Sequence, residues 1–200
     1  MTPDAGRPLR ADAQRNRDKI LAAAVRVFTD EGLDAHFERI AREAGVGTGT
    51  LYRNFPTREA LIEAAYRNEV ARLCDAVPGL LATMPPPEAL RAWTRRFIDY
   101  ATAKLGMANA LRAVVDAGTN PYADSHKMIQ AALSSLMDAN TAAGTIRSDI
   151  SPTDMFAALA GIALTSAKPE QREQAERLLD LTLDGLKPAH SRALSPEDLA

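Results

Sequence analysis

The stretch FERIAREAGVGTGTLYRNF, residues 37–55, places three glycines between two short segments that suit helices. Glycine inside a helix costs roughly 1 kcal/mol relative to alanine, so alternate glycines indicate an interruption of regular structure. The apolar residues before the glycines recur at helical spacing: Phe37, Ile40, Ala41 and Ala44. The chain must therefore either turn sharply between two helices here or form a glycine-rich loop that holds a phosphate.

The residues around the glycines favour the turn. A phosphate loop of the dinucleotide type requires a strand before its glycines, and a P-loop also requires a lysine after them; this stretch has neither. A helix–turn–helix requires a glycine at the corner and small residues where the second helix approaches DNA. We expect Gly45 to adopt a positive φ, Val46 to fill the angle between the helices, and Gly47 or Thr48 to cap the second helix.

The rest of the chain predicts an all-α fold, because alanine and leucine dominate at helical spacing and alternating strand patterns are rare. Gly32 and Gly144 are expected helix ends, and Ser151, Pro152 and Asp154 form a strong helix start. The sequence predicts about nine helices, at residues 14–31, 36–44, 48–54, 57–75, 87–104, 106–116 and 122–143 and from about 152 and 169 onward.

The segment VPGLLATMPPPEA, residues 77–89, holds four prolines and one glycine and is the best domain boundary in the sequence. We therefore expect a helix–turn–helix domain at 14–75 and a second helical domain at 76–188. Residues 1–13 and 189–200 are predicted to be a disordered arm and a disordered tail.

Charge gives no sign of nucleic-acid binding, because the formal net charge is −2 and residues 1–75 hold twelve Lys or Arg and twelve Asp or Glu. Any DNA contact must come from local placement of charge. The single cysteine, Cys74, fits a reducing compartment, and neither a secretory leader nor an apolar run of about 18 residues is present. We expect a cytoplasmic protein.

Catalytic patterns are missing from the sequence. The histidines His36, His126 and His190 lie in unrelated segments, and no HExxH, CxxC or GxSxG pattern occurs. We expect no catalytic residues, no metal and no cofactor. Two alternatives to a ligand-responsive regulator stay open: a DNA-binding protein without a ligand, and an enzyme. A thermal-shift screen with metabolites and antibiotics separates all three.

One segment resembles a known DNA-binding domain. RDKILAAAVRVFTDEGLDAHFERIAREAGVGTGTLYRNFPTREALIEAAY contains F-x-x-x-G, I-A-x-x-A-G-V, G-T-L-Y-x-x-F and then a basic residue followed by E-A-L-I. It is similar to the DNA-binding domain of the TetR family of bacterial transcriptional repressors. His36 stands where that family usually has Ser or Thr, so the cap of the second helix is weaker or comes from Asp34. Gly47 replaces a frequent serine, so Thr48 is expected to take over capping.

The resemblance implies a set of DNA contacts around the second short helix. Thr48, Gly49 and Tyr52 are expected to face the major groove, while Leu51 and Phe55 point into the core. Arg53 reads a guanine or grips the backbone. An ordinary solvated surface is the alternative for each residue. Arg10, Arg15 and Arg17 are candidates for an arm along the DNA backbone, and an ordinary disordered leader is the equal alternative for them. The expected contact set is Arg17, His36, Thr48, Gly49, Thr50, Tyr52, Arg53, Asn54 and Arg58.

The resemblance also implies that the second domain binds a small molecule and forms a homodimer. The alternative for each expected pocket residue is ordinary core packing or surface exposure. The alternative for the expected interface residues is packing within one chain. The expected pocket residues are Trp93, Phe97, Tyr100, Met107, Arg112, Tyr122, His126 and Met128. The expected dimer residues are Ala157, Ala158, Gly161, Leu178, Leu179, Leu183 and Leu186. The implied function is a ligand-responsive repressor that binds a pseudo-palindromic operator as a homodimer and is released by a small-molecule effector.

Overall fold

The computed structural model describes residues 6–165 and 169–188, and over these residues the protein is all-helical. The all-α prediction is confirmed. Nine α-helices and two short 3-10 turns make up the described part of the chain: α1 Gly6–Glu31, η1 Gly32–Asp34, α2 Phe37–Ala44, α3 Thr48–Asn54, α4 Arg58–Thr83, α5 Pro86–Gly106, α6 Ala108–Asp116, α7 Ser125–Ala142, α8 Pro152–Thr165, η2 Pro169–Gln171 and α9 Arg172–Gly185.

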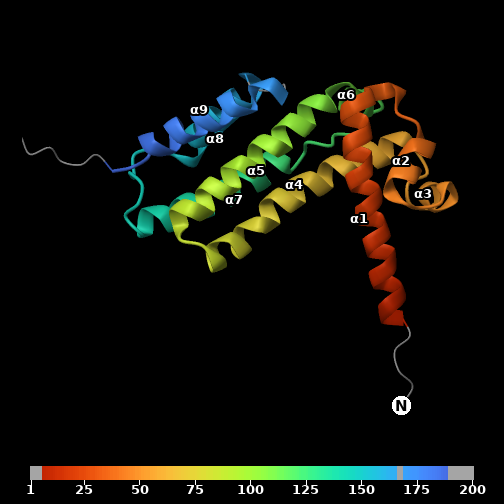
Figure 1. Ribbon diagram of the computed structural model, residues 1–200, viewed down its shortest axis with the longest axis horizontal. Coiled ribbons are helices and arrows are strands. Elements are labelled where there is room, and N and C mark those ends of the chain that lie inside the picture. Colours follow the sequence, from red (N-terminus) through yellow and green to blue (C-terminus); the bar gives the residue numbers. More distant parts are fainter. Residues whose placement is uncertain (1–5, 166–168, 189–200) are drawn as a thin grey trace, which may run out of the picture.

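The helices form an elongated bundle with a small helical unit at one end (Figure 1). Helices α4, α5 and α7 run along the long axis and pack on one another, and α8 and α9 lie against α5. The small unit at the end of the bundle consists of α1, which runs across that end, and of α2 and α3 beside it. Helix α4 packs against α1 as well as α5 and α7, so it joins the two parts of the molecule.

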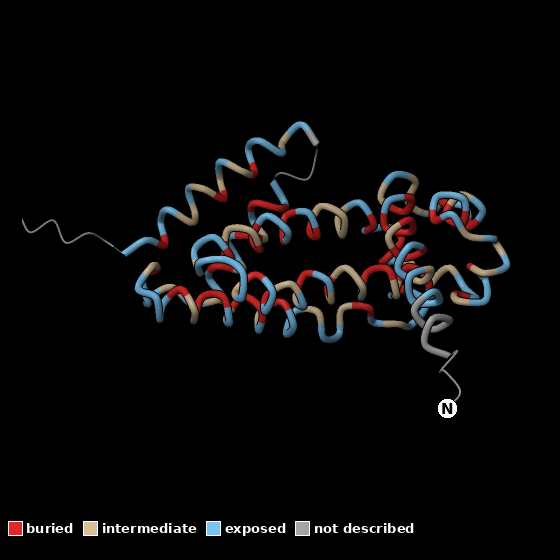
Figure 2. The backbone as a smooth tube through the Cα atoms, turned by 60° about the horizontal axis from the view of Figure 1, so that its bottom comes forward, coloured by how far each residue is buried: buried red, intermediate tan, exposed pale blue. Residues whose placement is uncertain are grey.

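Buried residues gather on the inner sides of the long helices and where α1 meets its neighbours (Figure 2). Trp93 is fully buried on α5, and its indole Nε1 donates a hydrogen bond to the carbonyl of Leu73 at 3.0 Å. Asn140 is also fully buried, and its Nδ2 donates to the carbonyls of Pro86 and Leu136 at 2.9 and 2.8 Å. These bonds compensate for desolvation of polar groups in the core.

Local sequence signals set several helix ends as expected. Gly144 has φ +68°, and the amides of Gly144 and Thr145 bond back to α7, which closes that helix. At the start of α8, Asp154 N donates to Ser151 Oγ at 3.2 Å, and Ser151 N donates to the Asp154 carboxylate at 3.0 Å. This reciprocal pair is a capping box, as the sequence predicts.

Two expectations about helix length were wrong. Helix α1 begins at Gly6 instead of residue 14, because Pro8 falls in the first turn, where no amide partner is lost, and good helix formers follow. Helix α4 continues through Pro78 to Thr83, because Val77 and Leu80 are buried on either side of the proline. The expected boundary near residue 76 therefore falls inside a helix. The remainder of the expected arm, residues 1–5, and the expected tail at 189–200 lie outside the described residues.

Candidate nucleic-acid interface and ligand cavity

Gly45 makes the corner between α2 and α3. Its φ of +67° is left-handed, its amide donates to the Arg42 carbonyl at 3.2 Å, and the Val46 amide donates to the Ala41 carbonyl at 3.0 Å. This pair of bonds is a Schellman motif, which ends a helix where glycine avoids the strain of a Cβ atom. Val46 packs partly buried against the core. The turn prediction is confirmed for both residues.

Capping at each of the two short helices follows one of the two expected alternatives: Gly47 at α3 and a weaker cap, at His36, for α2. Helix α3 has Gly47 as its N-cap without a side-chain hydrogen bond, and Thr48 is already the first helical residue. The expectation that Thr48 caps this helix was wrong, because a residue inside the first turn cannot stand in the N-cap position. Helix α2 has His36 as its N-cap, also without a side-chain hydrogen bond.

The two faces of α3 have opposite character. Leu51 is fully buried and Phe55 nearly so, whereas Tyr52 is 48% exposed and Gly49 and Arg53 are exposed. The Tyr52 ring packs at 5.0 Å from the ring of Phe37, so it is held against α2. Thr48, Thr50 and Asn54 are half-buried. The outer face thus carries an aromatic ring, a guanidinium group and a glycine that admits close approach.

Hydrogen bonds organise the polar side chains of this face. Arg53 Nη2 donates to Thr50 Oγ1 at 3.2 Å, and Asn54 Nδ2 donates to the Thr50 carbonyl at 2.8 Å. Arg17 on α1 lies over the Phe55 ring at 4.6 Å, which brings its charge beside the end of α3. Arg58 Nη2 donates to the Ala35 carbonyl at 2.6 Å and so ties the start of α4 to the start of α2. His36 is exposed beside them.

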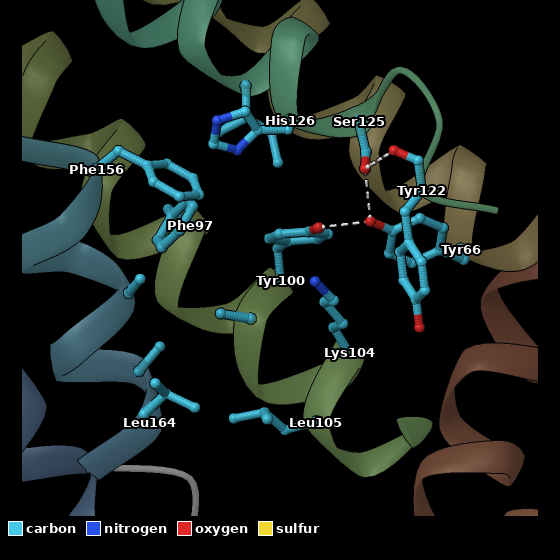
Figure 3. Close-up of a pocket in the computed structure, with 14 residues that line it drawn as sticks. Tyr66, Phe97, Tyr100, Lys104, Leu105, Tyr122, Ser125, His126, Phe156 and Leu164 are labelled. Atoms are coloured by element: carbon cyan, nitrogen blue, oxygen red, sulfur yellow. Dashed lines mark hydrogen bonds between the residues drawn. The ribbon is translucent and has the colours of Figure 1, made fainter. Parts of the chain in front are cut away.

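A second concave site, a pocket of about 420 Å³, lies among α4, α5, α7 and α8 (Figure 3). Four expected residues line it: Phe97, Tyr100, Tyr122 and His126. The other four do not. Trp93 and Met107 are core residues, Arg112 is exposed on α6, and Met128 lies 40% exposed outside this pocket.

The sequence did not reveal Tyr66, Lys104 and Ser125 as pocket residues. Tyr66 OH donates to Ser125 Oγ at 3.0 Å, and Ser125 Oγ donates to the Tyr122 carbonyl at 3.0 Å. The hydroxyls of Tyr66 and Tyr100 are 3.1 Å apart. A tyrosine on a buried helix face needs a hydroxyl partner, and that was the available signal for Tyr66. Lys104 carried no signal, because its neighbours come from distant segments.

Burial raises the pKa of the Tyr100 phenol far above its ordinary value, and the hydrogen bond with Tyr66 adds to the effect. Burial also raises the pKa of Tyr122. Both phenols are protonated at neutral pH, because burial disfavours the charged phenolate. The hydroxyls at this end of the pocket are therefore neutral hydrogen-bonding groups.

Comparison with known proteins identifies the family of both parts of the chain. Residues 20–65 match the family of bacterial regulatory proteins called the tetR family. Residues 85–188, more than half of the chain, match the C-terminal domain of SbtR-like transcriptional regulators of that family. The chain belongs to the TetR family. It is thus a DNA-binding transcriptional regulator with a helix–turn–helix domain.

Individual proteins similar to this chain are also transcriptional regulators. The crystal structure of the TetR transcriptional regulator SCO0520 from Streptomyces coelicolor is 81% identical, with a TM-score of 0.86, over 87% of this chain and 99% of that one. A TetR regulator from Mycobacterium vanbaalenii is 35% identical, with a TM-score of 0.74, over 90% and 100%. An HTH-type regulator of Staphylococcus aureus (strain USA300) is 43% identical over 54 residues, which span only 29% of its length.

The outward side of α8 and α9 in this TetR-family chain is partly apolar. Leu164 and Leu181 are 68% and 70% exposed, and Ala157, Ala158 and Gly161 are exposed on the same helix as Leu164. Of the expected dimer residues on α9, Leu178 and Leu183 are half-buried. Leu179 and Leu186 were also expected there, but both are buried within the protomer and offer little surface to a partner. The exposed Leu164 and Leu181 were not among the expected residues.

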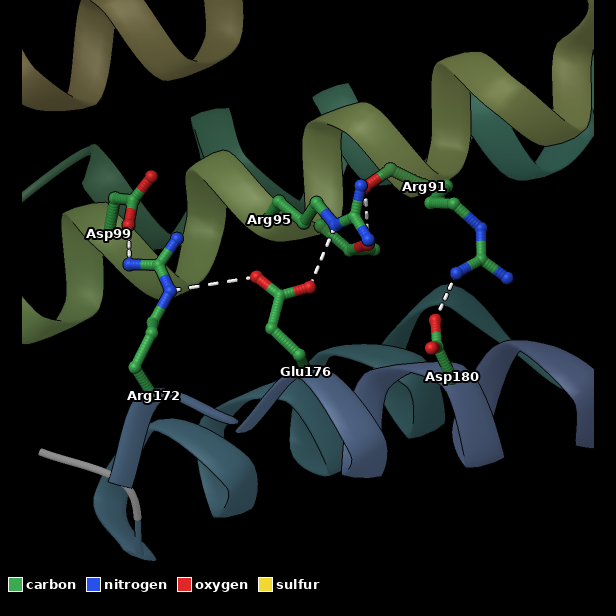
Figure 4. Close-up of polar contacts among 7 residues, drawn as sticks. Arg91, Arg95, Asp99, Arg172, Glu176 and Asp180 are labelled. Atoms are coloured by element: carbon green, nitrogen blue, oxygen red, sulfur yellow. Dashed lines mark hydrogen bonds and ion pairs between the residues drawn. The ribbon is translucent and has the colours of Figure 1, made fainter. Parts of the chain in front are cut away.

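Ion pairs hold α9 on α5 (Figure 4). Arg95 Nε lies 2.8 Å from the Glu176 carboxylate, and Arg91 and Arg172 pair with Asp180 and Asp99. These partly exposed contacts lie on the side of α9 that faces α5. Within the described ranges, no helix is both long and apolar enough to cross a membrane, and no three His, Cys, Asp or Glu side chains gather as a metal site would require.

Proposed function

We propose that the protein is a homodimeric repressor whose ligand-free form binds a pseudo-palindromic operator and whose effector-bound form releases it. The observation that carries the proposal is the course of α4. In its first turn, Arg58 donates a hydrogen bond to the Ala35 carbonyl of the helix–turn–helix unit. Further along the same helix, Tyr66 lines the pocket. Arg58 and Tyr66 are separated by eight residues, or about 12 Å of helix.

The proposed DNA surface is the outer face of α3 with its flanking cations. Tyr52, Gly49 and Thr48 enter the major groove, and Arg53 reads a base edge or grips the backbone. Thr50, Asn54, Arg58, Arg17 and His36 contact phosphates, which fix the register of the protein on DNA. We assign this role mainly to residues 14–75 and the effector and dimer roles to residues 76–188, with α4 shared between them. The regulator acts on DNA in the cytoplasm.

The proposed mechanism is a population shift. A dimer binds its operator when the two copies of α3 reach successive major grooves, roughly 34 Å apart. An effector that contacts Tyr66 on α4 and Tyr100 on α5 favours another arrangement of these helices, and the recognition helices no longer match the DNA. The difference in effector affinity between the two arrangements limits how far the operator is released.

The proposed dimer interface is the outward side of α8 and α9. Small residues at positions 157, 158 and 161 let a partner helix approach closely, and Leu164, Leu178, Leu181 and Leu183 supply apolar surface. A twofold axis through this side gives a four-helix contact, with two helices from each protomer.

Selection and sequencing of the DNA fragments retained by the purified protein tests the proposal. We expect a single motif with two inverted half-sites about one helical turn apart, and weaker enrichment of that motif with the Tyr52→Ala variant. The enriched operator then serves in a release assay with small molecules. Enrichment of unrelated fragments would contradict operator recognition. An operator that no compound releases, even a compound bound in the pocket, would indicate a DNA-binding protein without effector control.

A further inference from the structure

The pocket that we assign to the effector is largely apolar, and apart from His126 its polar side chains gather at one end. Phe97, Phe156 and His126 line one part, with the Phe97 and Phe156 rings 5.8 Å apart and the His126 and Phe156 rings 4.9 Å apart, both edge to face. Figure 3 shows Lys104 near the tyrosine hydroxyls, away from these three rings. Alanine and leucine side chains from α5 and α8 complete the walls.

Lys104 brings the one permanent charge to the lining formed by the described residues. Its Nζ lies 5.0 Å from the centre of the Tyr122 ring and 6.0 Å from that of Tyr66. Among the described residues, no carboxylate lies within 4.0 Å of this ammonium group. Ring faces attract a cation only weakly compared with a carboxylate, so the positive charge is incompletely compensated.

Three of the neighbouring hydroxyls, those of Tyr66, Tyr100 and Ser125, cannot donate to an anion, because their protons are already committed. Ser125 Oγ donates to the Tyr122 carbonyl, and Tyr66 OH donates to Ser125 Oγ. Tyr66 has one proton, so in its 3.1 Å contact with Tyr100 the donor is Tyr100. The chain of hydroxyls therefore presents lone pairs to the pocket, and Lys104 is the group at this end that can receive negative charge.

We infer that the effector is an amphipathic monoanion, with an apolar ring or acyl body among the aromatic side chains and a carboxylate on Lys104. This inference rests on the proposed effector role of the pocket. A cationic ligand is disfavoured by repulsion from Lys104. A neutral ligand leaves the charge of Lys104 without a counter-ion. A volume of about 420 Å³ is in the range of small-molecule sites.

The test uses the full chain and matched probes in isothermal titration calorimetry. One set is 2-naphthoate, 2-naphthalenemethanol and 2-naphthylmethylamine, and the other is octanoate, octanol and octylamine. In the wild type, at least one carboxylate should bind at least about tenfold more tightly than its alcohol and its amine. The set that shows the preference identifies the body of the ligand as ring or chain.

Three variants locate that preference. Lys104→Met keeps the length of the side chain and should abolish the preference for carboxylate over alcohol, whereas Lys104→Arg should retain it. Lys127→Met is the control, because Lys127 is exposed on α7 and does not line the pocket. It should behave as the wild type. The ratio between two ligands on one variant is independent of any small change in stability.

Several results would overturn the inference: equal or tighter binding of an alcohol or amine, a carboxylate preference that survives in Lys104→Met, or no binding by any of the six compounds. Operator release is measured separately. A carboxylate that binds through Lys104 but leaves operator affinity unchanged contradicts the proposed effector role and not the ligand chemistry. A neutral compound that binds this pocket and releases the operator contradicts the inferred ligand chemistry and not the proposed effector role.

Discussion

Leu51 and Tyr52 are neighbours in sequence that lie on opposite sides of α3. Leu51 is fully buried among the short helices, whereas Tyr52 is 48% exposed and touches Phe37 with its ring. Their orientation was expected from the spacing around Gly49 and is confirmed by burial. What Tyr52 contacts on DNA stays a prediction. The two residues therefore offer a test that separates recognition from folding.

Tyr52→Ala should weaken specific operator binding by about 1–3 kcal/mol, or roughly fivefold to 160-fold, because one specific contact is lost. The melting temperature should change little. Leu51→Ala should lower the free energy of unfolding by about 2–5 kcal/mol, because it opens a cavity. Binding titrations and thermal melts check both, with Tyr52→Phe as a control that keeps the ring. Early melting of Tyr52→Ala together with a stable Leu51→Ala would show that the face is inverted.

At the scale of the element, the end of α5 packs tightly on α1. A Cβ atom built on Gly106 overlaps Thr29 Cγ2 and comes within 3.1 Å of Thr29 Cβ and 3.3 Å of its Cα. Gly106 follows Lys104 and Leu105 of the pocket, and α1 belongs to the helix–turn–helix part. Glycine here allows the two helices to meet without a gap.

Gly106→Ala should lower the free energy of unfolding by roughly 1–3 kcal/mol, because the added methyl overpacks a contact that includes backbone. Gly79→Ala is the control: it lies in α4, and its added Cβ meets nothing within 4 Å. That change should raise stability by roughly 0.5–1 kcal/mol. Chemical denaturation measures both. A Gly106→Ala variant as stable as Gly79→Ala would disprove the close contact, and Thr29→Ser should relieve part of the clash.

Helix α9 offers a comparison between apolar burial and ion pairing. Leu179→Ala should cost about 2–5 kcal/mol of unfolding free energy, because Leu179 is 2% exposed. Arg95→Met breaks the pair with Glu176, whose two side chains are 49% and 31% exposed, and should cost less than about 1 kcal/mol because solvent screens the pair. Added salt should narrow the difference in unfolding free energy between Arg95→Met and the wild type. The difference between Leu179→Ala and the wild type should stay the same. A larger loss of unfolding free energy in Arg95→Met than in Leu179→Ala, measured by chemical denaturation, would show that ion pairing stabilises α9 more than apolar burial does.

Local signals predicted the elements better than their extents. Gly45, Gly144 and the Ser151–Asp154 box act within one helix turn, so the sequence alone reveals them. The continuation of α4 through Pro78 depends on the burial of Val77 and Leu80 against other helices, which no local pattern encodes. The pocket shows the same limit: Phe97 and Tyr100 were expected, but Lys104 joins Tyr66 and Tyr122 only after four helices assemble.

At the scale of the whole molecule, the outward side of α8 and α9 is the dimer interface that we propose. Leu164 and Leu181 are 68% and 70% exposed there, while Leu179 and Leu186 on the inner side are already buried. Large exposed leucines on adjacent helices favour association with a second copy. Operator recognition in our proposal depends on that association, because a single α3 reads one half-site.

Gly161→Glu should give a monomer with weak operator binding. Gly161 is exposed on α8, and a Cβ atom there meets nothing within 4 Å, so the protomer should fold as before. In a dimer, the same carboxylate would enter a close helix contact and lose hydration without a partner. Gly79→Glu is the matched control, because Gly79 is also an exposed helical glycine with open space around its Cβ position, on α4. Sedimentation, thermal melts and operator titration compare the two. A Gly161→Glu protein that remains dimeric removes residue 161 from the interface, whereas a monomer that still binds the operator at wild-type affinity contradicts recognition by a dimer.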